Sequence, residues 1–281
     1  MREIKTDIIT DAVRKLCIDA NCVIGDDVLD LLKKSIAKEE SPTGKEIIQQ
    51  IIDNDKLAGQ KGIPMCQDTG TAVTIVELGQ DAHITGGSLY DAINEGVRRG
   101  YKEGYLRKSI ISDPIGRKNT GDNTPAAIHV ELVPGDKLAI HILPKGGGGE
   151  NMGALVMLPP SAGIEGVKKF VIDMVKKAGA NPCPPIIVGV GVGGNFDGVA
   201  WLSKKALFRY PVGAPNPDPV YAKLEQELFT EINNLGIGPQ GLGGRVTALA
   251  VQVEYGPCHI TALPVAVNIN CHAARHKMVV L

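Results

Sequence analysis

Three cysteines lie where the sequence predicts one element to end and another to begin. Cys66 stands in the turn MCQDTGT, where an amide, a carboxylate and two hydroxyl groups crowd around it. Cys183 lies between prolines in NPCPP, and prolines fix the local backbone and thus the direction of the sulfur. Cys271 follows a predicted strand in NINCHAARH. Three thiolates could hold an iron–sulfur cluster with one iron open as a Lewis acid, but without a CxxC pair the spacing alone does not identify the metal.

The remaining cysteines leave a second interpretation open. Cys17 and Cys22 lie in or just after the first predicted helix, and we expect them to be packing residues. A zinc site could gather the cysteines and histidines nearest the C-terminus, namely Cys258, His259, Cys271, His272 and His276. Their spacing matches no standard zinc pattern, and residues 260–269 between them are predicted to form one strand. The alternative is a non-catalytic protein that binds an iron–sulfur cluster or zinc and takes part in protein interactions.

A glycine-rich loop, KGGGGEN, occupies residues 145–151 between two predicted strands. Four consecutive glycines cost backbone entropy, so a stable fold needs a reason for them. One reason is a row of backbone N–H groups that face an anion such as a carboxylate. The flanking Lys145 and Asn151 favour this binding role, and the alternative is a flexible hairpin tip.

A second glycine-rich segment, GVGVGG at residues 189–194, matches the dinucleotide pattern G-x-G-x-x-G. A dinucleotide site also needs a second strand that ends in an acidic residue about twenty positions further on. The chain instead continues into FRYP and a proline-rich loop. We therefore interpret this segment as a tight strand–helix turn, and a nicotinamide dehydrogenase is a weaker alternative.

Polar residues are unusually dense between residues 107 and 125, in a loop between a predicted helix and a predicted strand. Arg107 at its start could bind a carboxylate through its forked guanidinium group. A solvated connector is the alternative. The loop is thus a candidate substrate-binding segment.

The elements around these motifs predict a mixed α/β (α+β) fold. We treat residues 1–281 as a single domain, with a helical portion at 1–60 and an α/β portion at 61–281 that carries Cys66, Cys183 and Cys271. Apolar periodicity and β-branched runs predict helices at 4–16, 26–36, 44–57, 89–101, 163–178, 199–208 and 219–235, and strands at 71–78, 127–133, 137–143, 152–158, 186–190, 246–253 and 261–269. The strands at 127–133 and 137–143 are expected to pair as a hairpin through Pro134-Gly135.

Composition excludes several classes of function. A net charge of −1 and 4% aromatic residues argue against binding to nucleic acid or to an anionic membrane surface. The N-terminus has no apolar signal-peptide core, and the longest apolar runs are too short to span a membrane. We therefore expect a soluble, cytoplasmic protein whose six cysteines are not a disulfide framework.

Taken together, the motifs resemble the class I, iron–sulfur-dependent fumarases and the related tartrate dehydratases. From about residue 62 to residue 276, and in the order of that family, the matching pieces are MCQDTGT, LRKSIISDPIGRKNTGDNTPA, KGGGGEN, NPCPP and PCHITALPVAVNINCHAARH. The resemblance implies the fold of an iron–sulfur hydro-lyase N-terminal domain. It also implies reversible hydration of fumarate to L-malate, with L-tartrate dehydration as the alternative activity.

The resemblance also implies roles for individual residues. A [4Fe–4S] cluster would be held by Cys66, Cys183 and Cys271. Substrate contacts would come from Gln67, Arg107, Gly147 and Gly148, to which the loop position of Asn151 adds a further candidate. Proton transfer would involve Asp68 and His259, the latter supplied by the partner protomer of a dimer.

Members of this family that hold the whole enzyme in one chain are longer and carry a second domain with further substrate-binding residues. This sequence ends at Leu281, soon after the last motif. The hypothesis is therefore an α subunit that needs a separate β subunit, in an α2β2 assembly with homodimerisation through α. The α chain alone is then expected to bind the cluster but to show little activity.

Overall fold

The computed structural model describes residues 2–281 and has a mixed α/β fold, as the sequence predicts. Contacts divide the chain into two compact units. Unit 1 comprises the residues up to Gly25, Asn54–Gly147 and Arg275–Leu281, and unit 2 comprises Asp26–Asp53 and Gly148–Ala274. Each unit is therefore assembled from separate stretches of sequence, and the chain passes between the units four times.

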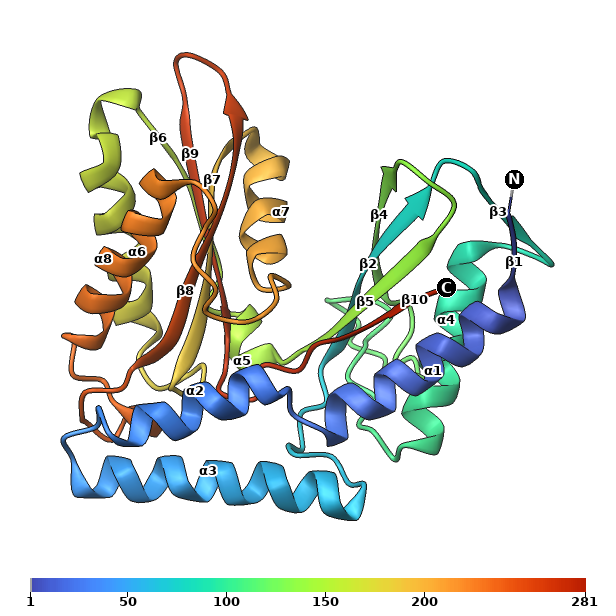
Figure 1. Cartoon of the computed structure of the whole chain (residues 1–281), viewed down its shortest axis with the longest axis horizontal. Helices are drawn as coiled ribbons and strands as arrows, with labels where there is room; N and C mark the ends of the chain where they lie inside the picture. The colour runs from blue at the N-terminus through green and yellow to red at the C-terminus, as the bar shows by residue number, and fades with distance from the viewer. Residues whose placement is uncertain (1) are drawn as a thin grey trace. The chain divides into compact units, whose positions relative to one another are not determined.

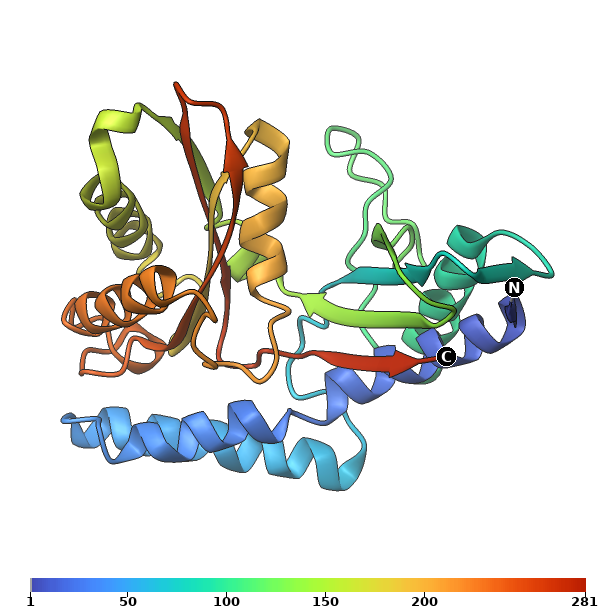
Figure 2. The ribbon, with the colours of Figure 1, turned by 45° about the horizontal axis from the view of Figure 1, so that its top comes forward.

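Unit 1 is built on a four-stranded mixed sheet in the order β10-β5-β2-β4. The strands are β2 (Thr71–Gly79), β4 (Ala127–Val133), β5 (Leu138–Lys145) and β10 (Lys277–Val280). Helices α1 (Thr6–Cys22) and α4 (Leu89–Glu103) pack against each other beside this sheet (Figures 1 and 2). A small parallel pair of strands, β1 (Arg2–Lys5) and β3 (Ala82–Thr85), completes the unit.

Helices α1 and α4 pack closely because two glycines of α4 face α1. A Cβ atom at Gly96 would lie 2.6 Å from the Cβ of Val13, and one at Gly100 would lie 2.8 Å from the carbonyl oxygen of Arg14. The buried residues of α1, including Val13, recur at the spacing of one helical face. The apolar core of unit 1 therefore lies between this helix pair and the sheet.

The predicted hairpin of residues 127–133 and 137–143 is wrong, although both strands form. Strand β2 lies between them, parallel to β4 and antiparallel to β5, so that Val76 is opposite both Val130 and Ile140. The two inner strands, β2 and β5, are mostly buried, whereas the edge strand β4 has no fully buried residue, which favours a central position for β2 over β4. The turn around Gly135 passes over the end of β2, where the N–H of Gly79 donates to the carbonyl of Lys137 at 2.8 Å.

Unit 2 contains a second four-stranded mixed sheet in the order β6-β9-β7-β8, in which only β7 and β8 are parallel. The strands are β6 (Ala154–Leu158), β7 (Ile186–Gly194), β8 (Ala248–Cys258) and β9 (Leu263–Asn270). Helices α6 (Gly163–Ala178) and α8 (Pro219–Asn233) cover one face of the sheet, and α7 (Phe196–Ala206) covers the other (Figure 1). Helix α2 (Asp26–Ile36) also contacts β8.

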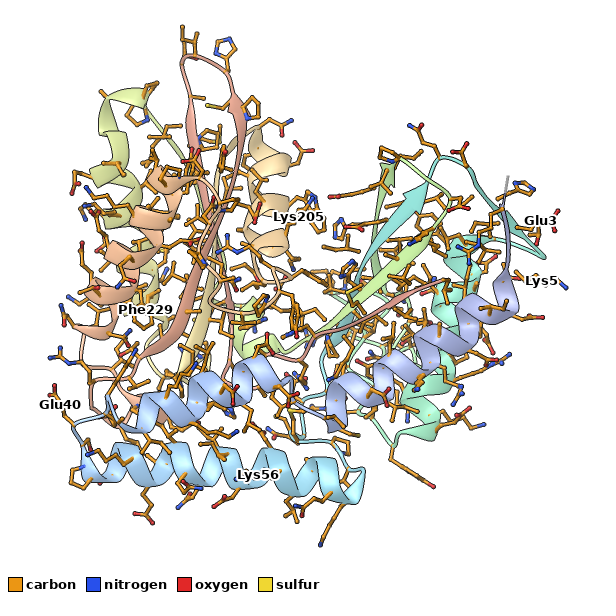
Figure 3. The ribbon with its side chains drawn as sticks, viewed as in Figure 1. Glu3, Lys5, Glu40, Lys56, Lys205 and Phe229 are labelled. Atoms are coloured by element: carbon orange, nitrogen blue, oxygen red, sulfur yellow. The ribbon has the colours of Figure 1, made fainter. Side chains whose placement is uncertain are left out.

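The core of unit 2 is aliphatic, and valines dominate its strands. Phe229 of α8, labelled in Figure 3, packs against this core, and the ammonium group of Lys38 lies 5.8 Å from its ring centre. Such a contact contributes about 0.5–1 kcal/mol at an exposed site. Helix α8 is thus held against the sheet by burial of its apolar side chains and, more weakly, by this cation–π contact.

Short elements account for most of what the sequence did not predict. They are β1, β3, β10, the four-residue helix α5 (Gly147–Glu150) and the 3₁₀ turns Pro160–Ala162 and Pro239–Gly241. The longer helices, including α3 (Pro42–Lys61), form at the predicted places with ends that differ by a few residues. None of the helices within residues 2–281 is both long enough and apolar enough to cross a membrane.

Candidate functional site

Asp68 and the first part of the glycine-rich loop, residues 145–147, lie together in unit 1. One carboxylate oxygen of Asp68, Oδ1, accepts the N–H of Gly70 at 3.0 Å, and the other, Oδ2, accepts the N–H of Gly147 at 2.9 Å. Both oxygens are therefore oriented by backbone donors. The loop does present an N–H group to an anion, and that anion is the protein's own carboxylate.

The turn that carries Asp68 is held by buried groups beneath it. Gly70 has a φ of +71°, and a Cβ there would lie 2.7 Å from the backbone of Lys145, so only glycine fits. The hydroxyl of Tyr101 donates to the carbonyls of Thr69 at 2.8 Å and Gly70 at 3.0 Å. Burial raises the pKa of Tyr101, which keeps the phenol protonated and able to donate.

Arg107 lies beside this turn because Thr69 binds its backbone. The N–H of Arg107 donates to the hydroxyl oxygen of Thr69 at 2.8 Å, and that hydroxyl is 3.2 Å from the carbonyl of Arg107. The side chain of Arg107 is exposed. The thiol of Cys66 lies 3.3 Å from the side-chain oxygen of Gln67. Unit 1 thus brings together Cys66, Gln67, Asp68, Arg107 and Gly147.

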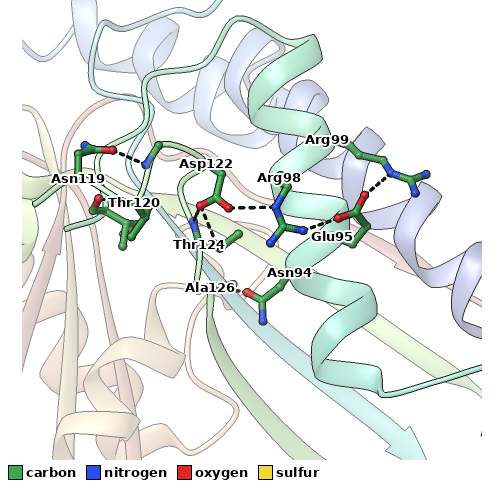
Figure 4. A network of polar contacts seen from close by, with 11 residues as sticks. Asn94, Glu95, Arg98, Arg99, Asn119, Thr120, Asp122, Thr124 and Ala126 are labelled. Atoms are coloured by element: carbon green, nitrogen blue, oxygen red, sulfur yellow. Dashed lines mark hydrogen bonds and ion pairs between the residues drawn. The ribbon is translucent and has the colours of Figure 1, made fainter. Parts of the chain in front are cut away.

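The polar loop after Arg107 is tied to α4 at its far end (Figure 4). The Nε of Arg98 donates to Asp122 at 2.9 Å, and Asn94 accepts the N–H of Ala126 at 2.8 Å. Partial burial acts to raise the pKa of Asp122, but hydrogen bonds from Thr124 and Arg98 outweigh it and lower the pKa to about 2. These contacts fix the loop against the helix.

In unit 2, Cys183 and Cys271 lie at the same end of the sheet. β7 and β9 are antiparallel neighbours with Ile187 opposite Asn270, so the residues before β7 meet those after β9. The N–H of His272 is 3.4 Å from the carbonyl oxygen of Cys183. Cys183 is exposed and Cys271 is half-buried. The register of two strands therefore brings these two thiols to one edge.

The second half of the glycine loop lies beside Cys183 in unit 2. A Cβ at Gly148 would lie 2.8 Å from the carbonyl oxygen of Asn181, two residues before Cys183. The amide of Asn181 also reaches the sulfur of Met152 at 3.7 Å. Asn151, between these contacts, is exposed. Gly148 and Met152, on either side of Asn151, thus contact Asn181, two residues before Cys183.

His259 is not brought to the cysteines of its own chain. It is exposed at the tip of the β8–β9 hairpin, where its Nδ1 is 2.8 Å from the hydroxyl of Thr261. Strand β9 has 8 residues between this tip and Cys271, and at ~3.3 Å per residue they span roughly 25 Å. The same strand separates Cys258 and His259 from Cys271 and His272, which disfavours the zinc site.

The cysteines differ in accessibility. Cys17 and Cys22 are buried, and burial raises the pKa of the Cys17 thiol to about 12. Cys66, Cys183 and Cys271 are at least partly accessible, and none of the six cysteines within residues 2–281 forms a disulfide. Cys258 is also accessible, but it lies at the hairpin end of β9. No group of three or more Cys, His, Asp or Glu positioned for a metal ion occurs within residues 2–281.

The segment at residues 189–194 is part of strand β7, rather than the tight turn that the sequence suggested. Cβ atoms at Gly189 and Gly191 would lie 2.3 Å and 2.4 Å from the carbonyls of Ser203 and Val199 in α7. These glycines therefore allow α7 to pack closely on β7. A helix backbone occupies the space in which a dinucleotide phosphate would have to approach.

Sequence reasoning missed the residues that support the Asp68 turn, chiefly Tyr101, Asn123 and Arg275. The amide of Asn123 donates to the carbonyl of Gly70 at 3.1 Å, and Arg275 donates to the carbonyl of Asp68 at 2.7 Å. All three side chains are buried. In the sequence, the only hint of this support was the position of Arg275 within the last motif, CHAARH, directly after two alanines.

Comparisons with known proteins found a matching family model and several relatives. A family model described as fumarate hydratase (Fumerase) matches residues 10–280. A protein of Methanocaldococcus jannaschii, provisionally named L(+)-tartrate dehydratase subunit alpha, is 40% identical over 277 residues, which cover 96% of each chain. The L(+)-tartrate dehydratase subunits alpha of Escherichia coli strains UTI89 and K12 are each 36% identical and cover 89% of this chain and 83% of their own.

Proposed function

Because the chain belongs to the fumarate hydratase (Fumerase) family of hydro-lyases, we propose that it is the α subunit of a [4Fe–4S]-dependent enzyme that dehydrates L(+)-tartrate. The observation that carries the choice of substrate is the match to subunits named for tartrate, at 40% identity over 96% of both chains. This match favours the alternative of the sequence analysis over its first choice, fumarate and L-malate. Fumarate hydration is the second candidate, supported by the description of the family model.

The donor set fits an iron–sulfur cluster. Cys66 is accessible in the turn that carries Asp68, and Cys183 and Cys271 are accessible at one end of the sheet of unit 2, whereas Cys258 lies at the other end of β9. Thiolates are the protein ligands of such clusters. When bound by these three, the cluster would supply an open iron that assists departure of the substrate hydroxyl. The three-cysteine assignment is part of the proposal.

The remaining chemistry is assigned to groups that unit 1 already holds in place. The exposed guanidinium of Arg107 and the amide of Gln67 would bind and orient a substrate carboxylate. Asp68 would exchange a proton with the substrate through its carboxylate, whose two oxygens are oriented by the N–H groups of Gly70 and Gly147. In unit 2, the backbone of Gly148 and the amide of Asn151 would add neutral donors.

Two partners follow from the same assignment. His259 lies roughly 25 Å along β9 from Cys271, so a second copy of the chain is the proposed source of this histidine. The names of the relatives designate an alpha subunit, which supports a separate β subunit. An α2β2 assembly, with contact between α chains, would satisfy both requirements.

The test is anaerobic reconstitution of the α chain with iron and sulfide, with and without its β chain, followed by assays on L(+)-tartrate, L-malate and fumarate. We expect oxaloacetate from tartrate, with kcat/KM at least about tenfold above that for L-malate, a difference of ~1.4 kcal/mol. A reversed ratio would establish the fumarate hydratase instead. Turnover by α alone would remove the β subunit from the proposal, and no iron uptake would remove the cluster.

A further inference from the structure

A buried arginine lies beneath the turn that carries Cys66, Gln67 and Asp68. The Nη1 of Arg275 donates to the main-chain carbonyl of Asp68 at 2.7 Å and to the side-chain oxygen of Asn21 at 3.0 Å. Arg275 is 2% exposed and Asn21 is fully buried. Removal of a guanidinium from water is costly, so its retention at this place needs a compensating role.

The contacts around Arg275 converge on both ends of the same turn. The main-chain carbonyl of Asn21 accepts the N–H of Met65 at 3.0 Å, and the side chain of Asn54 donates to the carbonyl of Met65 at 2.9 Å. Arg275 then binds the carbonyl of Asp68, three residues further on. The segment between Met65 and Asp68 is therefore fastened at its start and at its end.

A buried carboxylate provides a charge of opposite sign. Asp55 is 2% exposed, and burial raises its pKa to about 6, although Arg275 acts to lower that pKa. Among residues 2–281, neither Oδ2 of Asp55 nor Nε of Arg275 has a hydrogen-bond partner. The two groups thus interact through charge, while the hydrogen bonds of Arg275 go to Asp68 and Asn21.

Arg275 also approaches the glycine loop on the other side of Asp68. A Cβ at Gly146 would lie 3.3 Å from Oδ2 of Asp68 and 3.5 Å from Nη2 of Arg275. The guanidinium therefore supports the backbone of Asp68 close to where its carboxylate binds Gly147. A shift of this guanidinium would move the carboxylate and its neighbours Gln67 and Cys66.

We propose that Arg275 is a positioning residue, which sets the orientation of Asp68 by holding its carbonyl and is itself balanced by Asp55. It does not touch the substrate. The inference rests on the proposed function for its kinetic consequence, because Asp68 must be the proton-transfer group. The structural consequence concerns the backbone of residues 65–70 and of Gly147.

The first test needs no cofactor. Hydrogen exchange in the Arg275→Lys chain, measured by mass spectrometry, should show the amides of residues 65–70 and Gly147 exchanging about tenfold faster than in the wild type. Lysine keeps the charge but cannot present the planar fork of the guanidinium. The matched control is Arg209→Lys in unit 2, where the arginine likewise binds main-chain carbonyls, those of Val253 and Ala214, and a carboxylate, that of Glu225. The control should leave residues 65–70 unchanged.

The second test uses the reconstituted complex of α and β chains. Arg275→Lys should lower kcat roughly 10- to 100-fold, as expected for a misplaced catalytic group, with KM changed less than about threefold and the iron content kept. Arg209→Lys should lower Tm without this change in kcat. If Arg275→Lys does not fold, the Asp55→Asn variant tests the proposal in its place. In this variant the amides of residues 65–70 should also exchange faster than in the wild type.

Unchanged exchange at residues 65–70 in a folded variant would overturn the proposal. Wild-type kcat in Arg275→Lys, with a fall in Tm like that of the control, would reduce Arg275 to a structural residue. A wild-type complex that turns over neither tartrate nor malate would refute the proposed function instead, while the exchange result would still stand.

Discussion

Unit 1 holds its candidate site residues with side chains, whereas unit 2 holds its two cysteines with the register of two strands. The turn at Asp68 depends on Tyr101, Asn123 and Arg275, which come from separate parts of the sequence. Cys183 and Cys271 depend on the pairing of β7 with β9. Single side-chain changes should therefore alter orientation in unit 1, and backbone clashes should be the more damaging changes in unit 2.

The largest expected effect concerns the three thiols that are proposed to hold the cluster. Serine at Cys66, Cys183 or Cys271 should reduce iron uptake on reconstitution from about four irons per chain to less than one, and should abolish turnover. Cys258→Ser is the matched control, because this thiol is also accessible but lies at the hairpin end of β9. Iron counting and the visible spectrum provide the measurement.

The opposite result, in which Cys258→Ser loses iron and Cys66→Ser keeps it, would contradict the proposed set of cluster ligands. It would mean that unit 2 binds the metal without unit 1. Zinc in place of iron in the purified wild-type chain would point the same way, towards the interaction protein considered from the sequence.

The way in which the units are built explains what the sequence could predict. The cysteines were placed correctly at element boundaries because glycine and proline mark such boundaries locally. Helix α6 was predicted with its observed ends, since its apolar period is continuous. The hairpin failed because β2, more than fifty residues earlier, inserts between β4 and β5.

Other features could not be read from the sequence for physical reasons. A buried polar side chain such as that of Tyr101 or Arg275 resembles a surface residue until its hydrogen-bond partners are known. The two units have no linker to recognise, because the chain passes between them four times. The sequence could therefore suggest a set of candidate residues, which stays a prediction, but it could not reveal the network beneath Asp68.

The second largest effect is a pH dependence of stability that belongs to unit 1. Burial holds the pKa of Asp55 near 6, above its ordinary 3.8. Between pH 3.8 and pH 6 the carboxyl group is therefore more protonated in the folded state than in the unfolded state. The free energy of unfolding should fall as pH rises from about 4 to 6, by up to ~3 kcal/mol, and then stay level. Urea unfolding at several pH values measures this effect.

Asp55→Asn provides the control for that pH dependence. Asparagine has a similar shape and does not titrate in this range, so the fall between pH 4 and 6 should disappear. An unchanged slope in the variant would assign the effect to another group and would show that burial does not raise the pKa of Asp55.

A smaller effect separates the two halves of the glycine loop. Gly148→Ala should destabilise the protein by about 1–3 kcal/mol, because its Cβ would lie 2.8 Å from the carbonyl of Asn181, a backbone atom that cannot turn away. Gly147→Ala is the matched control, since its Cβ would meet only Oδ2 of Asp68 at 3.8 Å, an ordinary contact. Thermal unfolding compares the two variants, and equal losses would show that the loop moves as one segment.

The smallest effect tests whether side chains fix the Asp68 turn. Tyr101→Phe removes a hydroxyl that donates to the carbonyls of Thr69 and Gly70, and it leaves the buried ring in place. The loss should be about 1–2 kcal/mol in the free energy of unfolding, because the carbonyl of Gly70 keeps its bond from Asn123. Tyr105→Phe, at a site 91% exposed, should change nothing. A Tyr101→Phe variant as stable as the wild type, with unchanged amide exchange at residues 65–70, would mean that this hydroxyl does not hold the turn, which would leave Asn123 and Arg275 as its side-chain supports.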